Sequence, residues 1–415
     1  MQQQTSIFDF INHAPKTYKI SKPIRLIELF AGIGSQAKAL KNIGADFEHY
    51  KVVEFDKYAI SSYNAIHGTN FVTQDITKIK GSELEIVDTN KYCYIMTYSF
   101  PCQDLSLAGK QAGMTKGSST RSGLLWEVER LLNETKELPQ ILLMENVPQV
   151  HGNKNIQDFE KWIEFLQSKG YSNYWKDLNA KDYGIPQNRN RTFMVSILGS
   201  YEYDFPKSFE LKLRLKDLLE NFVDEKYYLS DKAIKYICDY NEVAKNKGRH
   251  VENARINTKL AKTISCRGVE TTQRADVSNY IAENCEEETL VKTLKEFIKY
   301  QDSTRPDVLG VVVLGNYSPS NHNASRIVDS GGLAPTVMEN HGTVTATYHN
   351  LRIRKLTPKE CWRLMGFDDE DFDNASNLNS NSQLYKQAGN SIVVNVLEAI
   401  FKELLWDVKK LTKKV

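Results

Sequence analysis

The chain has 415 residues, which is more than a single hydrophobic core usually supports, so two domains are expected. Hydrophobic residues make up 41% and charged residues 26%, which is typical of a globular protein and excludes a disordered chain. Basic and acidic residues nearly balance, 54 against 52, and the net charge of +2 therefore neither indicates nor excludes a nucleic-acid partner. There is no apolar run of membrane-spanning length and no export signal at the start, so we expect a cytoplasmic protein without membrane contact.

The six cysteines are scattered and include no C-x-x-C pair. They are Cys93, Cys102, Cys238, Cys266, Cys285 and Cys361. This spacing indicates neither a disulfide framework nor a zinc site, so no metal is expected.

The first predicted elements form a strand, a turn and a helix. Residues 24–29 read as a buried strand, the turn holds Gly32 and Gly34, and the helix is predicted over residues 36–43. This arrangement lets the backbone approach a nucleotide-like ligand. By itself it is a weak signal, because tight turns also use glycine for steric reasons.

Two acidic residues at successive strand ends strengthen the prediction. Glu54 ends a second strand roughly 20 residues after the glycines, where a partner for a ribose hydroxyl is expected. Residues 71–76 are predicted to be a third short strand, whose Asp75 would suit an adenine amino group. Together the two acids favour an adenosine-containing cofactor. The absence of a third glycine at the usual spacing argues against a nicotinamide dinucleotide.

A further buried strand is predicted over residues 94–98, and Pro101 then prevents the ladder from continuing. Cys102 therefore lies just past the carboxyl end of a strand, which is where open parallel sheets bind ligands. A lone cysteine in this position more often packs than reacts, so its role depends on the rest of the chain.

The next segments bring more polar groups to the same edge. Residues 109–122 are polar and long enough for an active-site lid, and Ser122 is predicted to cap the following helix. Glu145 ends the apolar strand 141–144, where a carboxylate is either solvated or functional. The basic run 187–191 leads into another strand.

From residue 199 the composition changes to Lys-, Asn- and Tyr-rich segments with short β-like pieces, which indicates a separate, partly β domain. After it, Pro358 is expected in the first turn of a helix. The acidic run 368–373 is expected to be a solvated loop, and residues 387–391 are expected to open a helix that continues to about residue 405.

In this order, the motifs resemble those of the bacterial and phage DNA (cytosine-5) methyltransferases. Any one of them is a weak pattern, but six in the family's order and spacing make chance a poor explanation. They are residues 30–34 (Phe-Ala-Gly-Ile-Gly), 100–103 (Phe-Pro-Cys-Gln), 145–147 (Glu-Asn-Val), 187–191 (Gln-Asn-Arg-Asn-Arg), 356–366 and 389–391 (Gly-Asn-Ser). One departure is Glu28, where many members have Asp.

The resemblance implies an α/β fold, namely a doubly wound, Rossmann-like sheet of an S-adenosylmethionine-dependent methyltransferase with a second, smaller, partly β target-recognition domain. Residues 1–22 would be an N-terminal arm. Residues 23–198 and 375–415 would form a discontinuous catalytic domain, and residues 199–374 the target-recognition domain.

The resemblance also implies the chemistry. Cys102 would attack C6 of a flipped-out cytosine, and Glu145 would hold N3 and the N4 amino group while C5 accepts a methyl group. Arg191, with Arg189, would supply a cation to the O2 edge or a phosphate. Surface salt bridges are the alternative reading, above all for Arg189.

The implied methyl donor is S-adenosylmethionine, with S-adenosylhomocysteine as the product. The residues expected to bind it are Phe30, Ala31, Gly32, Gly34, Glu54, Phe55, Asp75, Ile76, Pro101, Leu124, Asn390 and Ser391. The implied partner is double-stranded DNA, for which a monomer suffices. The resemblance further implies an enzyme that either has a cognate restriction endonuclease or is a phage or orphan methylase. Residues expected to contact DNA are Gln103, Ser106, Asn321, His322, Asn323, Arg326 and Thr336.

Two other functions remain open at this point. One is a tRNA cytosine-5 methyltransferase on the same scaffold, against which the long middle domain argues, because reading duplex sequence needs such a module. The other is a catalytically silent DNA-binding protein, against which intact Cys102, Glu145 and Arg191 argue.

Overall fold

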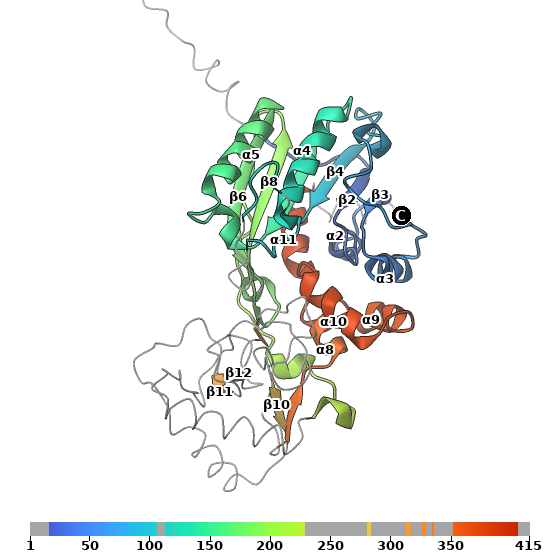
Figure 1. The fold of residues 1–415 in the computed structure, drawn as a ribbon, viewed down its shortest axis with the longest axis vertical. Helices are drawn as coiled ribbons and strands as arrows, with labels where there is room; N and C mark the ends of the chain where they lie inside the picture. The colour runs from blue at the N-terminus through green and yellow to red at the C-terminus, as the bar shows by residue number, and fades with distance from the viewer. Residues whose placement is uncertain are drawn as a thin grey trace, which may run out of the picture.

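The computed structural model describes residues 16–105, 113–118, 120–228 and 354–405 with their side chains, and the backbone of residues 280–283, 313–316, 326–328, 334–335 and 352–353 (Figure 1). Among these described residues, no helix is both long enough and apolar enough to cross a membrane. The α/β part occupies the upper half of Figure 1.

A six-stranded sheet forms the centre of the α/β part. In spatial order its strands are β3 (Phe47–Val53), β2 (Ile24–Leu29), β4 (Cys93–Tyr98), β5 (Ile141–Asn146), β8 (Asn190–Leu198) and β6 (Tyr171–Asn179). The first four are parallel, and β8 runs antiparallel to both of its neighbours. The carboxyl ends of the parallel strands and the start of β8 therefore meet at one edge of the sheet.

Helices cover both faces of this sheet, because successive side chains of each strand point to opposite faces. On β4, Ile95 packs on the face of α2 (Ser35–Asn42) and α11 (Val394–Leu404), whereas Met96 packs on the face of α4 (Leu125–Glu134) and α5 (Ile156–Ser168). The predicted doubly wound α/β fold is confirmed.

The end of the chain completes this core. Its helices are α8 (Pro358–Arg363), α9 (Asp369–Ser376), α10 (Asn381–Asn390) and α11. Trp362 and Phe401 share one core with Ile24 of the first central strand. Tyr203 and Leu215 belong to it too, so the core includes residues from both sides of positions 198 and 374.

The remaining elements are short or peripheral. α3 (Lys57–His67) packs beside α9. Single helical turns occur at Gly81–Leu84, Arg121–Leu124, Pro148–His151, Ala180–Tyr183, Leu215–Leu218 and Glu225–Tyr227. β1 (Lys16–Thr17) pairs with β9 (Tyr201–Glu202), and the Ile20 amide donates to Leu404 O at 2.7 Å, so residues 16–20 dock on the α/β part.

A second sheet has four strands in the order β11 (Val313–Asn316), β12 (Arg326–Val328), β10 (Tyr280–Glu283) and β14 (Arg352–Lys355). A short pair joins β13 (Ala334–Pro335) to β7 (Gln187–Asn188), which lies directly before β8. Strands in this part of the chain agree with the partly β character expected from its composition.

The strand expected over residues 71–76 is wrong, because this segment is irregular. The Asn64 side chain donates to Phe71 O and accepts from Phe71 N, both at 2.9 Å, and so replaces a strand partner. One backbone bond of 2.8 Å, from Gln74 N to Glu54 O, still holds the segment beside the end of β3.

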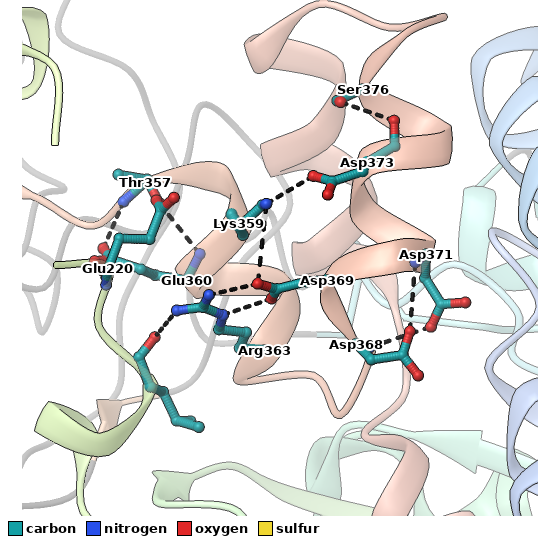
Figure 2. A network of polar contacts seen from close by, with 11 residues as sticks. Glu220, Thr357, Lys359, Glu360, Arg363, Asp368, Asp369, Asp371, Asp373 and Ser376 are labelled. Carbon is teal, nitrogen blue, oxygen red and sulfur yellow. Dashed lines mark hydrogen bonds and ion pairs between the residues drawn. The ribbon is translucent and has the colours of Figure 1, made fainter. Parts of the chain in front are cut away.

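The acidic run 368–373 is not a solvated loop either. Asp368 caps the N-terminus of α9 and Asp371 is buried. Both carboxylates lie 2.7 Å from Nζ of the buried Lys38 on α2. Figure 2 shows Asp368 and Asp371 beside the Arg363–Asp369 pair that joins α8 to α9. The acids therefore attach α9 to the helix after the glycine turn.

Two predicted helix starts are also wrong. Residues 387–390 end α10 rather than open a helix, and α11 begins only at Val394. Thr120, not Ser122, provides the cap, because its Oγ1 accepts from Gly123 N at 3.2 Å in the turn before α4.

Candidate active site

Cys102 lies in the loop after β4, where it is partly exposed and is not part of a disulfide. Two side chains fix the backbone just before it. Ser122 donates from Oγ to Pro101 O at 2.6 Å, and Asn146 donates from Nδ2 to Phe100 O at 2.9 Å. The position of the thiol thus depends on the helical turn before α4 and on the end of β5.

Glu145 and Arg191 form an ion pair at the same edge, with 3.2 Å between Arg191 Nε and Glu145 Oε1. Their strands β5 and β8 are neighbours, and β5 also neighbours β4. Burial raises the pKa of the Glu145 carboxyl, whereas the nearby cations Arg191 and Arg189 lower it. The structure thus brings a thiol, a buried carboxyl group and a guanidinium to adjoining strand ends.

Arg189 is buried, so it is not a surface salt-bridge residue. Its Nη2 donates to Gly389 O at 3.0 Å and to Ser391 O at 2.8 Å. The side chain therefore contacts the end of α10.

The glycine turn has an unusual backbone. Phe30 has a φ of 57°, which is uncommon for a residue other than glycine. Such strained backbone is often found at functional sites. A Cβ on Gly34 would lie 2.3 Å from His67 Nε2, so this position requires glycine. A Cβ on Gly32 would meet no atom within 4 Å, which leaves its backbone open to a ligand. Ala31 is buried beside them.

Glu54 faces this turn. Its carboxylate accepts from Gly32 N at 2.9 Å and from Asp56 N at 2.8 Å, and burial raises its pKa. The next residue, Phe55, is 76% exposed, which is unusual for an aromatic ring. A carboxylate fixed by two amides beside an exposed ring suits a nucleoside.

Asp75 and Ile76 lie beside Glu54 because of the bond from Gln74 to Glu54. Hydrogen bonds from the Thr77 hydroxyl and amide lower the pKa of Asp75. Ile76 is buried, and its carbonyl accepts from Arg130 Nη2 at 2.9 Å.

Helix α10 docks beside the loop after β3. Lys386 Nζ lies 2.7 Å from Asp56 Oδ2, Gln387 Nε2 donates to Tyr58 O at 2.9 Å, and Ser62 Oγ donates to Gln387 Oε1 at 2.9 Å. These contacts hold the end of α10, with exposed Asn390 and buried Ser391, close to the Glu54 loop. The sequence analysis did not single out Asp56, Lys386 or Gln387, because their pairing depends on packing.

The structure describes only part of the expected DNA-contacting set. Gln103, the residue after Cys102, accepts from Arg121 Nη1 at 3.0 Å. Leu124 of the cofactor set is half-buried at the start of α4. The expected residues Ser106, Asn321, His322, Asn323 and Thr336 lie outside the described residues, and Arg326 is described only as backbone. In the described ranges no cluster of His, Cys, Asp or Glu could hold a metal ion.

The sequence profile of the C-5 cytosine-specific DNA methylases matches residues 24–406. The chain belongs to this family. The methylase is 33% identical to the type II methyltransferase M2.ScrFI of Lactococcus lactis subsp. cremoris, over 92% of this chain and 99% of that protein. It is 30% identical to the orphan methyltransferase M.SPBetaI of Bacillus phage SPbeta, over 92% of this chain and 97% of that protein.

A solved structure agrees at the level of the fold. The Dnmt2 methyltransferase of S. pombe matches with a TM-score of 0.58 and 19% identity, over 93% of this chain and 99% of that chain. At that identity the likeness concerns the fold alone. The family and its relatives establish the methylase as a DNA cytosine-5 methyltransferase.

Proposed function

We propose that this methylase takes its methyl group from S-adenosylmethionine and forms a covalent bond between Cys102 and C6 of a flipped-out cytosine. The single observation that carries the proposal is that Cys102 follows β4 at the sheet edge where the neighbouring strands β5 and β8 carry the Glu145–Arg191 ion pair. A cysteine thiolate is the side chain best suited to attack C6, which makes C5 nucleophilic.

The carboxyl group of Glu145 provides the second requirement. Attack at C6 pushes negative charge into the ring, and a proton held at N3 stabilises it. Burial favours the protonated form of Glu145, which donates to N3 through one oxygen and accepts from the N4 amino group through the other. Arg191 orients this carboxyl group and presents a positive charge toward the O2 edge. Thymine, which carries O4 and a proton on N3, would not fit this donor–acceptor pattern.

The residues around the glycine turn fit S-adenosylmethionine. Glu54 would accept from the ribose hydroxyls, Phe55 would cover the adenine ring, and the open backbone at Gly32 would face the methionine part. Bound here, the cofactor supplies an activated methyl group. The remaining contacts would come from Phe30, Ala31, Gly34, Asp75, Ile76, Pro101, Leu124, Asn390 and Ser391.

We further propose double-stranded DNA as the substrate form, with the target base flipped out, since a duplex hides C6 within its stack. The strands between Tyr280 and Lys355 would belong to the target-recognition domain proposed at residues 199–374, next to a catalytic domain at 23–198 and 375–415 and an arm at 1–22. Tyr203, Leu215 and Trp362, near the two ends of the 199–374 segment, pack in the core of the catalytic domain. A monomer would suffice for one such site. By analogy with the type II methyltransferase M2.ScrFI, the enzyme would work with a cognate restriction endonuclease; by analogy with M.SPBetaI, it would be a phage or orphan methylase. In either case we propose that it acts in the cytoplasm, where Cys102 stays reduced.

The test is covalent trapping on duplex DNA in which 5-fluorocytosine replaces cytosine at random positions. Fluorine at C5 cannot leave as a proton does, so the bond to Cys102 persists after methyl transfer. We expect a denaturation-resistant protein–DNA complex that requires S-adenosylmethionine. Cys102→Ser should abolish it, whereas Cys93→Ser, at a buried cysteine on β4, should preserve it. A complex that survives Cys102→Ser would contradict the assignment.

A further inference from the structure

Backbone hydrogen bonds hold the main chain of Arg189 in place. The residue lies between β7 and β8 and only 4% of it is exposed. Its amide donates to Gln187 O at 3.0 Å and its carbonyl accepts from Ala180 N at 3.0 Å. Because the backbone is held on both sides, the direction of the side chain is set by the start of β8.

The guanidinium group joins this strand to the end of α10. The last carbonyls of a helix lack partners within the helix and carry partial negative charge, so a cation is favourable there. Arg189 donates to Gly389 O and Ser391 O, which flank the expected cofactor residue Asn390. One planar group therefore fixes the backbone on both sides of Asn390.

The same segment carries the base-binding pair. Arg191 follows Arg189 by two residues and contacts Glu145. The Arg189 charge also acts on Glu145, whose pKa it lowers. Arg189 thus interacts both with the carboxyl group proposed to bind the cytosine and with the backbone proposed to bind the cofactor.

We propose that Arg189 is a positioning residue that couples binding of the target cytosine to binding of the cofactor. When Glu145 and Arg191 bind a base, the backbone at the start of β8 becomes more ordered. Through its hydrogen bonds, Arg189 then also orders the carbonyls of Gly389 and Ser391 at the end of α10. This inference rests on the proposed function, since it takes the two pockets as assigned there. Coupling of this kind is reciprocal, so the cofactor product should tighten DNA binding equally.

Gln187 provides a matched control. It is fully buried on β7 and its Nε2 donates to Leu364 O at 2.7 Å, which ties the same segment to the end of α8 instead of α10. Gln187→Met and Arg189→Met each remove buried donors and leave carbonyls without them. A general loss of stability should therefore affect both variants, whereas a loss of coupling should affect only Arg189→Met.

The experiment measures the dissociation constant of S-adenosylhomocysteine by calorimetry, without DNA and with saturating sheared genomic DNA from a methylation-free host. In the wild type and in Gln187→Met, we expect DNA to tighten binding by about 5-fold or more. In Arg189→Met the ratio should fall to about 1. Arg189→Lys covers the case in which Arg189→Met does not fold. It keeps a positive charge near Glu145, but the lysine side chain is shorter, so its ammonium group does not reach the position of Arg189 Nη2, the atom that donates both bonds. The ratio should therefore fall in this variant too.

A ratio in Arg189→Lys or Arg189→Met equal to that of the wild type would overturn the inference, and so would a wild-type ratio of about 1. Methyl incorporation into the same DNA separates the two claims. If the wild type incorporates methyl groups but shows no coupling, only the inference about Arg189 fails. If the wild type incorporates none, the proposed function fails first.

Discussion

Arg191 Nε lies 3.2 Å from Glu145 Oε1, across the boundary where the parallel part of the sheet meets its antiparallel strand β8. A carboxylate at the end of a buried strand would be costly alone, because burial disfavours its charged form. In the ion pair, Arg191 orients the Glu145 carboxyl group, and burial allows that carboxyl group to hold a proton.

Methyl transfer should decrease as pH rises through the pKa of Glu145, because the protonated carboxyl group is the form that donates to N3. Burial raises this pKa, so the protonated form persists to higher pH than for an exposed Glu. Arg191→Met removes a cation that lowers the pKa and should shift the alkaline limb of the single-turnover rate to higher pH. Glu145→Gln should lower the rate by about 10²–10⁴-fold and abolish that limb. A limb that persists in Glu145→Gln would assign the titration to another group.

Asn146→Ala should slow methyl transfer through the loop that carries Cys102. The Asn146 side chain donates a hydrogen bond to Phe100 O at 2.9 Å. Removing this side chain leaves the buried carbonyl of Phe100 without that donor, which costs about 1–3 kcal/mol. We expect kcat to fall more than tenfold, while the affinity for S-adenosylhomocysteine changes little. Asn173→Ala is the control, since Asn173 also donates to a backbone carbonyl, Tyr171 O, but on the edge strand β6. Equal losses of kcat in both variants would contradict the prediction.

Glu28 should make stability depend on pH. It is fully buried, and desolvation raises its pKa from 4.5 to about 7. The folded state therefore binds more protons than the unfolded state in this range, and the free energy of unfolding should decrease as pH rises from 4.5 to 7, by up to about 3 kcal/mol.

Glu28→Gln, which keeps the shape of the protonated acid, should remove that decrease and make the variant the more stable protein at pH 8. Urea unfolding at several pH values measures both chains. A Glu28→Gln protein that loses as much stability as the wild type between pH 4.5 and 7 would show that Glu28 is not the titrating group.

Two ion pairs on α8 should differ sharply in their contribution to stability. Arg354 and Glu360 are both fully buried, with Nη2 and Oε1 2.9 Å apart, whereas Arg363 and Asp369 pair at the surface (Figure 2). Glu360→Gln should cost about 3–5 kcal/mol, since it leaves the Arg354 charge buried without its counter-ion. Asp369→Asn should cost less than about 1 kcal/mol, because water screens the exposed pair. Chemical unfolding of both variants would detect this difference, and equal costs would contradict the explanation.

The sequence predicted what short-range patterns determine. The strand 24–29, the glycine turn and the strand that ends before Cys102 follow from apolar runs and from residues that stop them, and the structure has each of them. Glu145 was also expected at the carboxyl edge of the sheet, because parallel strands that are connected by helices all end at the same edge.

The errors occur where distant residues decide the conformation. Asp371 looked like a solvated residue, yet Lys38, more than 300 positions away, neutralises it in the interior. Gly389 looked like the start of a helix, but it lies within the last turn of α10, near the Arg189 guanidinium. No local pattern reports such partners, so neither α9 nor the role of Arg189 could be predicted.

The most direct test of the central claim is base-resolution bisulfite sequencing of DNA from a methylation-free bacterial host that expresses this chain, beside a host that expresses Cys102→Ser. The account predicts 5-methylcytosine in one short sequence context with the wild type and none with the variant. Methylation that persists in Cys102→Ser would contradict Cys102 as the nucleophile. An unmodified genome in both hosts, with soluble wild-type protein that binds S-adenosylmethionine, would contradict duplex DNA as the substrate.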